Sequence, residues 1–286
     1  MLSYLQGIIL GILQGVTELF PMSSLGHSVI LPKILGWDID QQSPFFLMFL
    51  VATHSSTALV LLLFFLKDWR RIVSGLFRSV KERKINDSDS DAKLAWLLIV
   101  GTIPAGLVGL LLKHFIRKFL LSGVLAAVFL LLNGLLLFGA DALRRKALIS
   151  NAVDSDLRIS KMTWWQAFKV GLMQVLALIP GFSRTGSTLA GSLMVGLSHE
   201  DSVRFSFLLA TPIIGAAAAL ELPKLFTSGN SAAIGVSLVG GLSAALFSYL
   251  SVKFLTAYFK IENRKLTPFA LYCVVAGAGS LIYFLH

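Results

Sequence analysis

Six apolar runs, each about as long as a bilayer is thick, constrain this chain more than any other feature. They cover residues 44–66, 94–112, 119–140, 203–222, 232–255 and 268–285. An α-helix needs about 20 apolar residues to cross the hydrocarbon core, because each residue advances the helix by only ~1.5 Å. The sequence therefore predicts an all-α, polytopic membrane protein with about six spanning helices.

The composition excludes the soluble classes of protein. Charged residues make up 14% of the 286 residues and hydrophobic residues 56%, whereas a soluble domain carries about 25% charged residues. Such a chain cannot cover its own surface in water, which excludes a soluble enzyme, a disordered protein and a fibre. Cys273 is the only cysteine, so an intrachain disulfide and a cysteine-based metal site are excluded as well.

The basic residues are clustered between the apolar runs. In a soluble protein a formal net charge of +10 would suggest nucleic acid as a ligand. Here, eight of the 25 Lys and Arg residues lie in 67–93 and five lie in 144–161. The positive-inside rule predicts that both connectors are cytoplasmic, where they also meet anionic headgroups. We therefore expect membrane lipid, and no nucleic acid, among the partners.

Two further apolar stretches are interrupted at a proline. Residues 2–20 break at Pro21 and resume at about 28–35, and residues 164–179 break at Pro180 and resume at about 188–197. A broken helix followed by a short one indicates a re-entrant hairpin. Its non-helical backbone is tolerated at membrane depth only where protein or a wet cavity surrounds it. The predicted fold is therefore six spanning helices plus two broken helical hairpins.

The two interrupted regions repeat one another. The shared residues are 160 positions apart, so that Gly11, Gln14, Ser23 and Gly26 correspond to Gly171, Gln174, Ser183 and Gly186. A second echo links 49–53 with 207–211. We therefore predict one membrane domain, 1–286, whose related halves, about 1–140 and 162–286, are joined by the basic connector 141–161, and we favour an inverted relation between the halves. Paired interrupted segments indicate a midplane site between the repeats.

Few ionisable residues lie within the apolar part of the chain, and we expect them to surround one wet cavity. A charge at the bilayer centre costs about 2.5–3.5 kcal/mol even on the most lenient scale, so scattered charges would be unfavourable. The residues concerned are Glu18, His27, His54 and Arg184. For His54, together with Gln174, we predict a secondary polar site or hydrogen bonds that join helices.

The second break has the chemistry of a phosphate site, because it reads Pro-Gly-Phe-Ser-Arg-Thr-Gly-Ser-Thr. Arg184 carries a planar fork of donors that matches phosphate oxygens, and the glycines let backbone amides approach the same oxygens. The first break offers a carboxylate, two hydroxyls and an imidazole for acid–base work. The predicted phosphate-binding residues are Ser23, Ser183, Arg184, Thr185, Gly186 and Thr188.

These residues also have structural interpretations. Glu18 could be the ion-pair partner of Arg184, His27 could be a hydrogen-bonded core histidine, and Ser23 and Ser24 could cap the following short helix. A transporter or lipid flippase is the alternative function, because repeats around a midplane site are typical of transporters. Phosphate release would discriminate between the two functions.

The two hairpins resemble the signature regions of the bacterial undecaprenyl-diphosphate phosphatase family, the bacitracin-resistance type. The family's first motif is similar to residues 14–27, which read Gln-Gly-Val-Thr-Glu-Leu-Phe-Pro-Met-Ser-Ser-Leu-Gly-His, and its second motif is similar to residues 180–188. Residues 204–212 also fit the family's pattern. The resemblance implies hydrolysis of undecaprenyl diphosphate to undecaprenyl phosphate and inorganic phosphate. That reaction recycles the lipid carrier of cell-wall synthesis and gives resistance to bacitracin.

The resemblance also implies roles for residues. Glu18, Ser24, His27 and Arg184 would be catalytic, with Ser24 as the nucleophile or as the group that orients a water, and with His27 as the general acid–base. A divalent cation, Mg²⁺ or Ca²⁺, would be held by Glu18 with help from Gln14. Where the family has its first glutamate this chain has Gln14, which cannot take a proton. A divergent paralogue with weak catalysis is therefore a further alternative.

The resemblance implies a place in the cell and a partner. It predicts a multi-pass protein of the bacterial cytoplasmic (inner) membrane, with the active site toward the outer face. The substrate would be a long-chain polyprenyl diphosphate, and a homodimer is left open. A second type of membrane phosphatase has a histidine six residues after its motif arginine, but the residue at that distance from Arg184 is Ala190, so we set that type aside.

Overall fold

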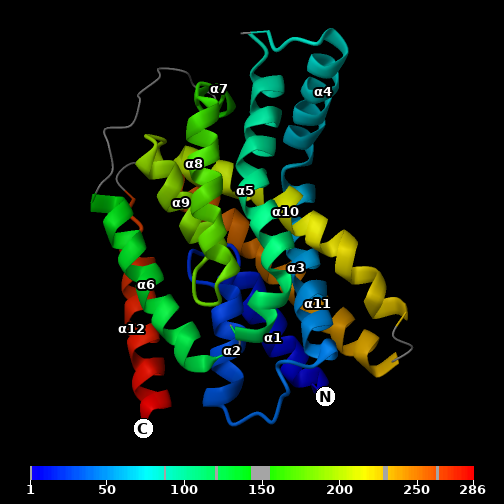
Figure 1. The fold of residues 1–286 in the computed structure, drawn as a ribbon, viewed down its shortest axis with the longest axis vertical. Helices are drawn as coiled ribbons and strands as arrows, with labels where there is room; N and C mark the ends of the chain where they lie inside the picture. Colours follow the sequence, from blue (N-terminus) through cyan, green and yellow to red (C-terminus); the bar gives the residue numbers. More distant parts are fainter. Residues whose placement is uncertain (1, 87, 120–121, 143–154, 228–230, 262–263) are drawn as a thin grey trace.

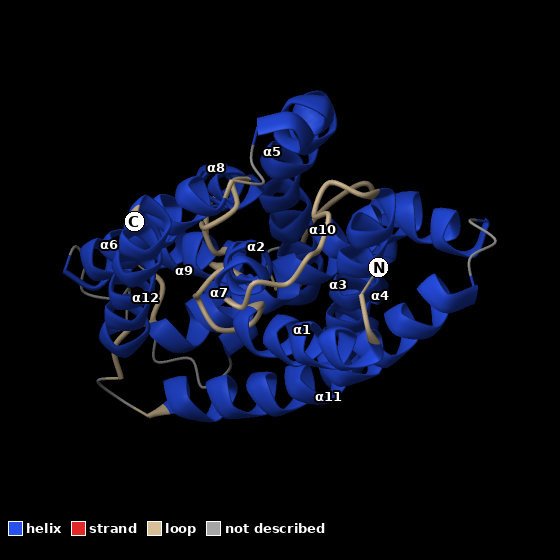
Figure 2. Cartoon of the chain, turned by 90° about the horizontal axis from the view of Figure 1, so that it is seen from below, coloured by secondary structure: helices blue, strands red, loops and turns tan. Residues whose placement is uncertain are grey.

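The computed structural model describes residues 2–86, 88–119, 122–142, 155–227, 231–261 and 264–286. In these ranges every regular element is a helix (Figures 1 and 2). Among the described residues six helices are long and apolar enough to cross a membrane. They are α3 (Pro44–Phe64), α5 (Ser90–Phe119), α6 (Gly123–Ala142), α10 (His199–Thr227), α11 (Ser231–Lys260) and α12 (Thr267–Leu285). The predicted all-α, polytopic membrane fold is confirmed.

The spanning helices are apolar on the faces they bury and also on the faces they expose. On α5, Leu94 and Leu97 are fully buried, whereas Leu110 and Leu111 are 64% and 80% exposed. An exposed apolar surface of this extent would be unfavourable in water, but it matches the lipid tails that surround a spanning helix. The outward leucines are therefore the lipid-facing surface of the protein.

The basic connectors contain two helices that the apolar runs did not predict. α4 (Leu66–Glu82) is amphipathic, and its C-cap residue Arg83 adopts a left-handed conformation. α7 (Ser155–Ser160) buries the carboxylate of Asp156, to which Arg71 of α4 donates at 2.8 Å and Arg204 of α10 at 2.6 Å. The predicted connector 141–161 lies outside the described residues between 143 and 154. In the described part of this connector, the ion pairs of Asp156 join α7 to α4 and α10.

Both predicted hairpins form, but their second helices begin earlier than the sequence suggested. The first hairpin consists of α1 (Tyr4–Thr17) and α2 (Ser24–Ile34). The second consists of α8 (Trp164–Val175), the 3₁₀ turn η1 (Leu176–Leu178) and α9 (Arg184–Met194). The predicted starts of the second helices, at about residues 28 and 188, were each four residues too late. The reason is capping, since the hydroxyls of Ser23 and Ser183 accept the amides of Gly26 and Gly186 at 3.2 and 3.1 Å.

Each hairpin packs against a helix from the other half of the chain. α1 lies along α11, and α8 lies along α5. The first hairpin enters from the end of the molecule that carries both termini, and the second enters from the end that carries α4 and α7 (Figure 1). The two tips consequently meet in the middle of the molecule from opposite directions.

Glycines allow the hairpins to approach their partner helices closely. A Cβ atom at Gly171 of α8 would lie 2.5 Å from the carbonyl oxygen of Gly101 on α5, and a Cβ atom at Gly11 of α1 would collide with the carbonyl of Gly240 on α11. Backbone carbonyls cannot move aside as side chains can. These glycines therefore fix how deeply the hairpins are inserted.

Gly171→Ala is expected to lower the free energy of unfolding by about 1–3 kcal/mol, because overpacking pushes α8 away from α5. The measurement is thermal unfolding of the purified protein in detergent. Gly139→Ala on α6 is the matched control, since a Cβ atom there meets nothing within 4 Å. Equal melting temperatures for the two variants would contradict this account of the packing.

Candidate active site

A cavity of about 740 Å³ lies where the two hairpin tips meet α3, α5 and α10. One part of its wall is polar and includes Glu18, Ser23, Ser24, His54, Gln174, Ser183 and Arg184. The other part is apolar and includes Leu47, Met48, Val51, Leu178, Ile213, Ile214 and Ala217. A cavity with both kinds of wall suits a ligand that has a polar head and an apolar tail.

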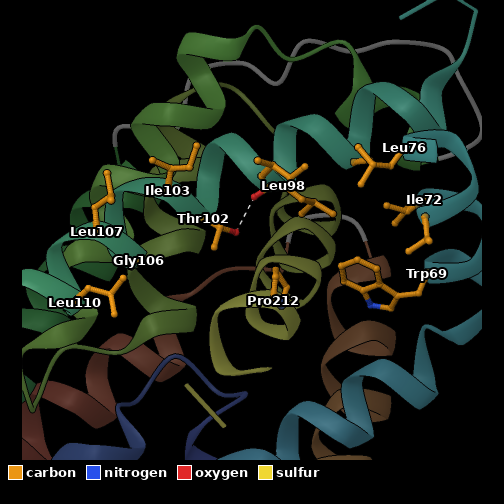
Figure 3. A pocket seen from close by; sticks show the side chains of 13 residues that line it. Trp69, Ile72, Leu76, Leu98, Thr102, Ile103, Gly106, Leu107, Leu110 and Pro212 are labelled. Carbon is orange, nitrogen blue, oxygen red and sulfur yellow. Dashed lines mark hydrogen bonds between the residues drawn. The ribbon is translucent and has the colours of Figure 1, made fainter. Parts of the chain in front are cut away.

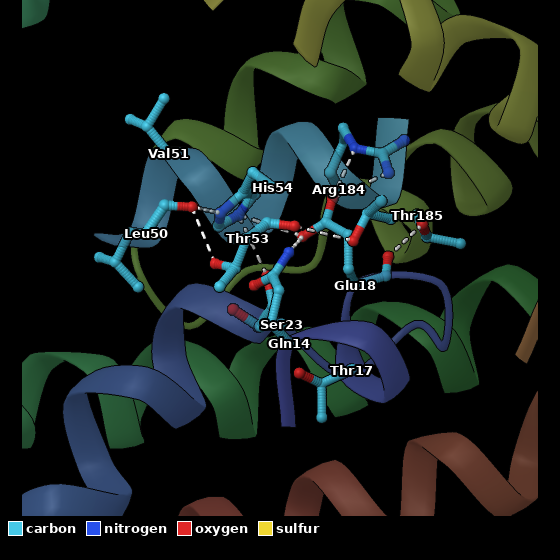
Figure 4. A network of polar contacts seen from close by, with 12 residues as sticks. Gln14, Thr17, Glu18, Ser23, Leu50, Val51, Thr53, His54, Arg184 and Thr185 are labelled. Carbon is cyan, nitrogen blue, oxygen red and sulfur yellow. Dashed lines mark hydrogen bonds and ion pairs between the residues drawn. The ribbon is translucent and has the colours of Figure 1, made fainter. Parts of the chain in front are cut away.

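The centre of the polar wall is an ion pair between the two hairpins. Arg184, the first residue of α9, donates to Glu18 Oε1 from Nη2 at 2.8 Å and from Nε at 3.1 Å (Figure 4). Its Nη1 points to the carbonyl of Ser206 at 3.4 Å. The Glu18 side chain is 6% exposed and that of Arg184 10%. The ion-pair interpretation of Glu18 is therefore realised inside the cavity wall.

Three further side chains lie around the second carboxylate oxygen of Glu18, Oε2. Ser24 donates its hydroxyl to Oε2, and the Gln14 amide donates to the same atom at 3.3 Å. His54 Nε2 lies 3.3 Å from Oε2 and 3.5 Å from Ser24 Oγ. The other ring nitrogen of His54, Nδ1, donates to the carbonyl of Leu50 at 2.7 Å (Figure 4). His54 therefore belongs to the main polar centre and does not form a separate site.

The backbone at Ser23 presents Ser24 to the cavity. Ser23 has φ 69°, a left-handed conformation that is uncommon for any residue other than glycine. Such conformations persist where the surroundings hold them in place, and they cluster at functional sites. The strained residue is also the N-cap of α2, so the hydroxyl of Ser24 and the start of the helix reach the cavity together.

Two direct hydrogen bonds and the bridging side chain of Asn133 hold the hairpin tips together. The amide of Gly181 donates to Ser23 Oγ at 3.2 Å, and the hydroxyl of Thr185 donates to the carbonyl of Glu18 at 2.8 Å. Asn133 of α6 joins the tips from outside: its Nδ2 donates to the carbonyl of Pro21 at 2.9 Å, and its Oδ1 accepts the amide of Ser183 at 3.0 Å. Asn133 is fully buried, so both bonds form away from water.

Asn133→Ala is expected to cost about 1–3 kcal/mol of stability for each backbone group that it leaves buried without a partner. Asn133→Asp keeps an acceptor for the Ser183 amide but turns a second carboxyl oxygen toward the carbonyl of Pro21 in a fully buried site, so it should not recover the stability that the alanine variant loses. Thermal unfolding in detergent measures both. The bridging role would be wrong if Asn133→Ala melted like the wild type.

Several predicted site residues lie outside the cavity lining. His27 donates from Nδ1 to the carbonyl of Ser23 at 2.7 Å, and its Nε2 lies 2.9 Å from the hydroxyl of Tyr272 on α12. The His27 and Tyr272 rings also stack, with centroids 5.7 Å apart. The predicted phosphate-binding Thr188 donates within its own helix to the carbonyl of Arg184. Thr185, Gly186 and Thr188 pack at the base of the hairpin tip and do not line the cavity.

Gln174 lines the main cavity as His54 does, so the predicted secondary polar site is not a separate one. Gln174 is 1% exposed, and neither its amide oxygen nor its amide nitrogen has a hydrogen-bond partner among the described residues. Its counterpart Gln14 has a partner for its nitrogen but none for its oxygen. Buried amides usually find partners, so Gln174, which lines the cavity, is ready to accept or donate bonds to a ligand.

The donor set around Glu18 does not fit a resident divalent cation. Mg²⁺ and Ca²⁺ prefer several oxygen ligands, carboxylates above all. Among the described residues, the carboxylates that line the cavity are Glu18 and Glu221 of α10. The two oxygens of Glu18 already receive donors from Arg184, Ser24 and Gln14. No group of three or more His, Cys, Asp or Glu residues that could hold a metal occurs in the described part of the chain. Arg184 occupies the place next to Glu18 that a cation would need.

A second cavity lacks this chemistry. It has a volume of about 380 Å³, lies between α4, α5 and α10, and is lined by apolar residues such as Trp69, Leu98 and Leu107 (Figure 3). Its one hydroxyl, from Thr102, donates to the carbonyl of Leu98 at 2.7 Å. The cavity offers no charged group to a phosphate. The cavity between the hairpins is therefore the candidate active site.

Sequence reasoning missed two residues that hold the first hairpin in place, Asn133 at the hairpin tips and Tyr272 beside His27. Asn133 was hidden inside an apolar run, although a lone buried amide in such a run is itself a signal. Tyr272 was also missed, and no pattern in the sequence links it to His27, which is 245 positions away.

Comparison with known proteins shows the family of this chain. The model of the family described as bacitracin resistance protein BacA matches residues 7–279. A protein of Mycolicibacterium paratuberculosis named undecaprenyl-diphosphatase is 44% identical, over 99% of this chain and 97% of its own. A protein of Burkholderia ambifaria named undecaprenyl-diphosphatase 2 is 46% identical, over 97% of this chain and 96% of its own length. A protein of Chromobacterium violaceum with the same name is 43% identical, over 98% of both chains. The chain therefore belongs to the BacA family of bacitracin resistance proteins.

Proposed function

We propose that this chain hydrolyses undecaprenyl diphosphate to undecaprenyl phosphate and inorganic phosphate. Family membership and the names of the relatives support this activity. One structural observation carries it: the hydroxyl of Ser24, the guanidinium of Arg184 and the N-termini of α2 and α9 meet at one cavity. The N-terminus of a helix favours an anion, because its amides and its dipole both point at the ligand.

The polar wall of the cavity binds the diphosphate of the substrate, and the apolar wall binds its hydrocarbon chain. The diphosphate lies against Arg184, Ser183 and the helix N-termini, and the buried amide of Gln174 supplies a further donor. The undecaprenyl chain follows the apolar wall between α3 and α10, past Met48 and Ile213. Glu18 keeps the Arg184 fork in place through its two hydrogen bonds.

Ser24 is the nucleophile in this mechanism. Its Oγ forms a bond to the terminal phosphorus while the bond from that phosphorus to the bridging oxygen breaks, and undecaprenyl phosphate leaves. Water then displaces the seryl oxygen and releases inorganic phosphate. Catalysis of phosphoryl transfer is mostly positioning and charge stabilisation, and Arg184 supplies the charge. No step is assigned to a protein-bound cation, because the donor set does not fit one; a cation that enters with the diphosphate would be bound by the substrate's own oxygens.

The cavity opens toward the outer face of the bacterial cytoplasmic membrane in this proposal. The basic connectors 67–93 and 155–161 lie at the end of the molecule that carries α4 and α7 (Figure 1), and the positive-inside rule assigns that end to the cytoplasm. The lining residues Pro44 and Leu47 belong to the first turn of α3, toward the opposite end.

The test is phosphate release from undecaprenyl diphosphate by the purified protein in detergent, with added Mg²⁺ and with EDTA. We expect catalytic release by the wild type and a higher rate for Gln14→Glu if the missing carboxylate limits turnover. No release by the folded wild type or by Gln14→Glu would overturn the hydrolase proposal and favour lipid transport.

A further inference from the structure

We propose that His54 of α3, and not His27, exchanges the proton with Ser24 in this chain. The inference rests on the proposed phosphatase function and assigns its proton acceptor. His54 Nε2 lies 3.5 Å from Ser24 Oγ, and the ring lines the cavity with a side-chain exposure of 24%. A general base must lie within reach of the proton that it removes, directly or after small closure on the substrate.

The tautomer of His54 suits this task. Its Nδ1 lies 2.7 Å from the carbonyl of Leu50, which can only accept, so Nδ1 carries a proton. In the neutral ring the lone pair is therefore on Nε2, on the side of Ser24 and Glu18. Once Nε2 has taken the proton, the imidazolium lies 3.3 Å from Glu18 Oε2. Glu18 thus stabilises the charged ring from the side of the nitrogen that takes the proton, and the carbonyl of Leu50 holds Nδ1, the position that the carboxylate takes in a catalytic triad.

His27 has neither property. Both of its nitrogens are engaged away from the cavity, Nδ1 with the carbonyl of Ser23 and Nε2 with the hydroxyl of Tyr272. It is 8% exposed, and it is not among the cavity-lining residues. The arrangement is that of a histidine that holds α2 against α12.

The other ionisable groups around α3 cannot replace His54. Those that face the cavity are Glu18, Arg184 and Glu221 of α10. Arg184 stays protonated at ordinary pH and cannot accept a proton, and Glu18 is held as its counter-ion. Glu221 lies toward the far end of α10, near Ala217 and Ala218. α11, which also packs on α3, contributes the hydroxyl of Ser248 to Thr57.

Because position 14 carries an amide, which cannot titrate, His54 is needed as the proton acceptor. Gln14 donates its amide to Glu18 Oε2, the same oxygen that accepts the hydroxyl of Ser24. A carboxylic acid at position 14, the residue the family motif would have there, could take a proton, but an amide cannot. His54 therefore provides the titratable group that position 14 lacks.

The proton is accounted for at every step. When Oγ of Ser24 bonds to the terminal phosphorus, its proton moves to Nε2 of His54, and the bridging bond breaks with the electron pair on undecaprenyl phosphate. When water attacks the phosphoserine, the proton on Nε2 returns to Oγ as the phosphorus–Oγ bond breaks. The water's own protons leave with inorganic phosphate.

The experiment compares phosphate release from undecaprenyl diphosphate by wild type, His54→Gln and His27→Gln across pH. Removal of a general base costs about 10²–10⁴-fold, so we expect kcat/KM of His54→Gln to fall by about 100-fold or more. A base works only when neutral, so the wild-type rate should decline as pH falls through the pKa of the ring, and this decline should be absent in His54→Gln. His27→Gln should keep the decline, whatever its effect on stability.

Two rescue measurements separate a chemical role from a structural one. Added imidazole should restore part of the activity of His54→Ala, because truncation leaves room in the cavity wall, and it should not restore His27→Ala. Gln14→Glu in the His54→Gln background should also recover activity. Wild-type release with an unchanged pH profile in His54→Gln, or imidazole rescue of His27→Ala alone, would overturn the inference while leaving the phosphatase proposal intact.

Discussion

Arg184→Ala is expected to lower kcat/KM for phosphate release by about 10³-fold or more, as the loss of a transition-state arginine does in other phosphoryl-transfer sites. The guanidinium lies at the start of α9, where it lines the cavity and places a positive charge in the wall of the proposed diphosphate site. Arg184→Lys keeps the charge but loses the fork that matches phosphate oxygens, so it should recover only part of the rate.

The same substitution also destabilises the protein, and a second variant separates the two effects. Arg184→Ala leaves the Glu18 carboxylate buried without its 2.8 Å partner, which costs about 3–5 kcal/mol in comparable pairs. Combining Arg184→Gln with Glu18→Gln removes both charges. We expect thermal stability in detergent to return toward the wild-type value in the double variant, while phosphate release stays lost. Recovery of activity together with stability would show that the pair is structural only.

Ser24→Ala is expected to lower kcat by at least about 10⁴-fold, since removal of a serine nucleophile has effects of this size or larger elsewhere. The hydroxyl donates to Glu18 Oε2 and lies beside His54, at the start of α2. Substrate labelled in its terminal phosphate should label the wild-type chain after acid quenching, and the label should map to Ser24. Ser24→Ala should stay unlabelled.

Ser28→Ala provides the matched control for this experiment. Ser28 lies one turn further along α2, is fully buried, and its hydroxyl has no partner among the described side chains and backbone groups. We expect it to keep both label and turnover. A Ser24→Ala variant that turned over at the wild-type rate would rule out Ser24 as the nucleophile, whereas slow turnover without any label in the wild type would favour direct attack by water.

The sequence was sufficient for those features that depend on local pattern. Run lengths predicted the six spanning helices, and the two prolines located the breaks at residues 21 and 180. The family suggested by the motifs is confirmed by the match over residues 7–279. The helix starts were placed four residues too late, although Ser23 was considered as a helix cap and is one, because a serine that caps a helix looks the same in sequence as a serine in a turn.

Features that depend on distant packing could not be read from the chain in this way. His27 and His54 are equally polar in sequence, and only the position of α12 decides that His27 contacts Tyr272 instead of the cavity. In the same way, Asn133 contacts both hairpins because α6 lies beside them. The predicted roles of Glu18, Ser24 and Arg184 remain predictions, but the structure brings these three side chains together at one cavity.

The central claim is that the two hairpins form one active centre, and a double-mutant cycle tests it most directly. The cycle measures kcat/KM of phosphate release for Ser24→Ala on the first hairpin, Arg184→Lys on the second, and the two combined. Residues that act as a unit have grossly non-additive effects. We predict that the combined variant is about as slow as Ser24→Ala alone. Losses that multiply, as they do for distant and independent sites, would contradict a single centre.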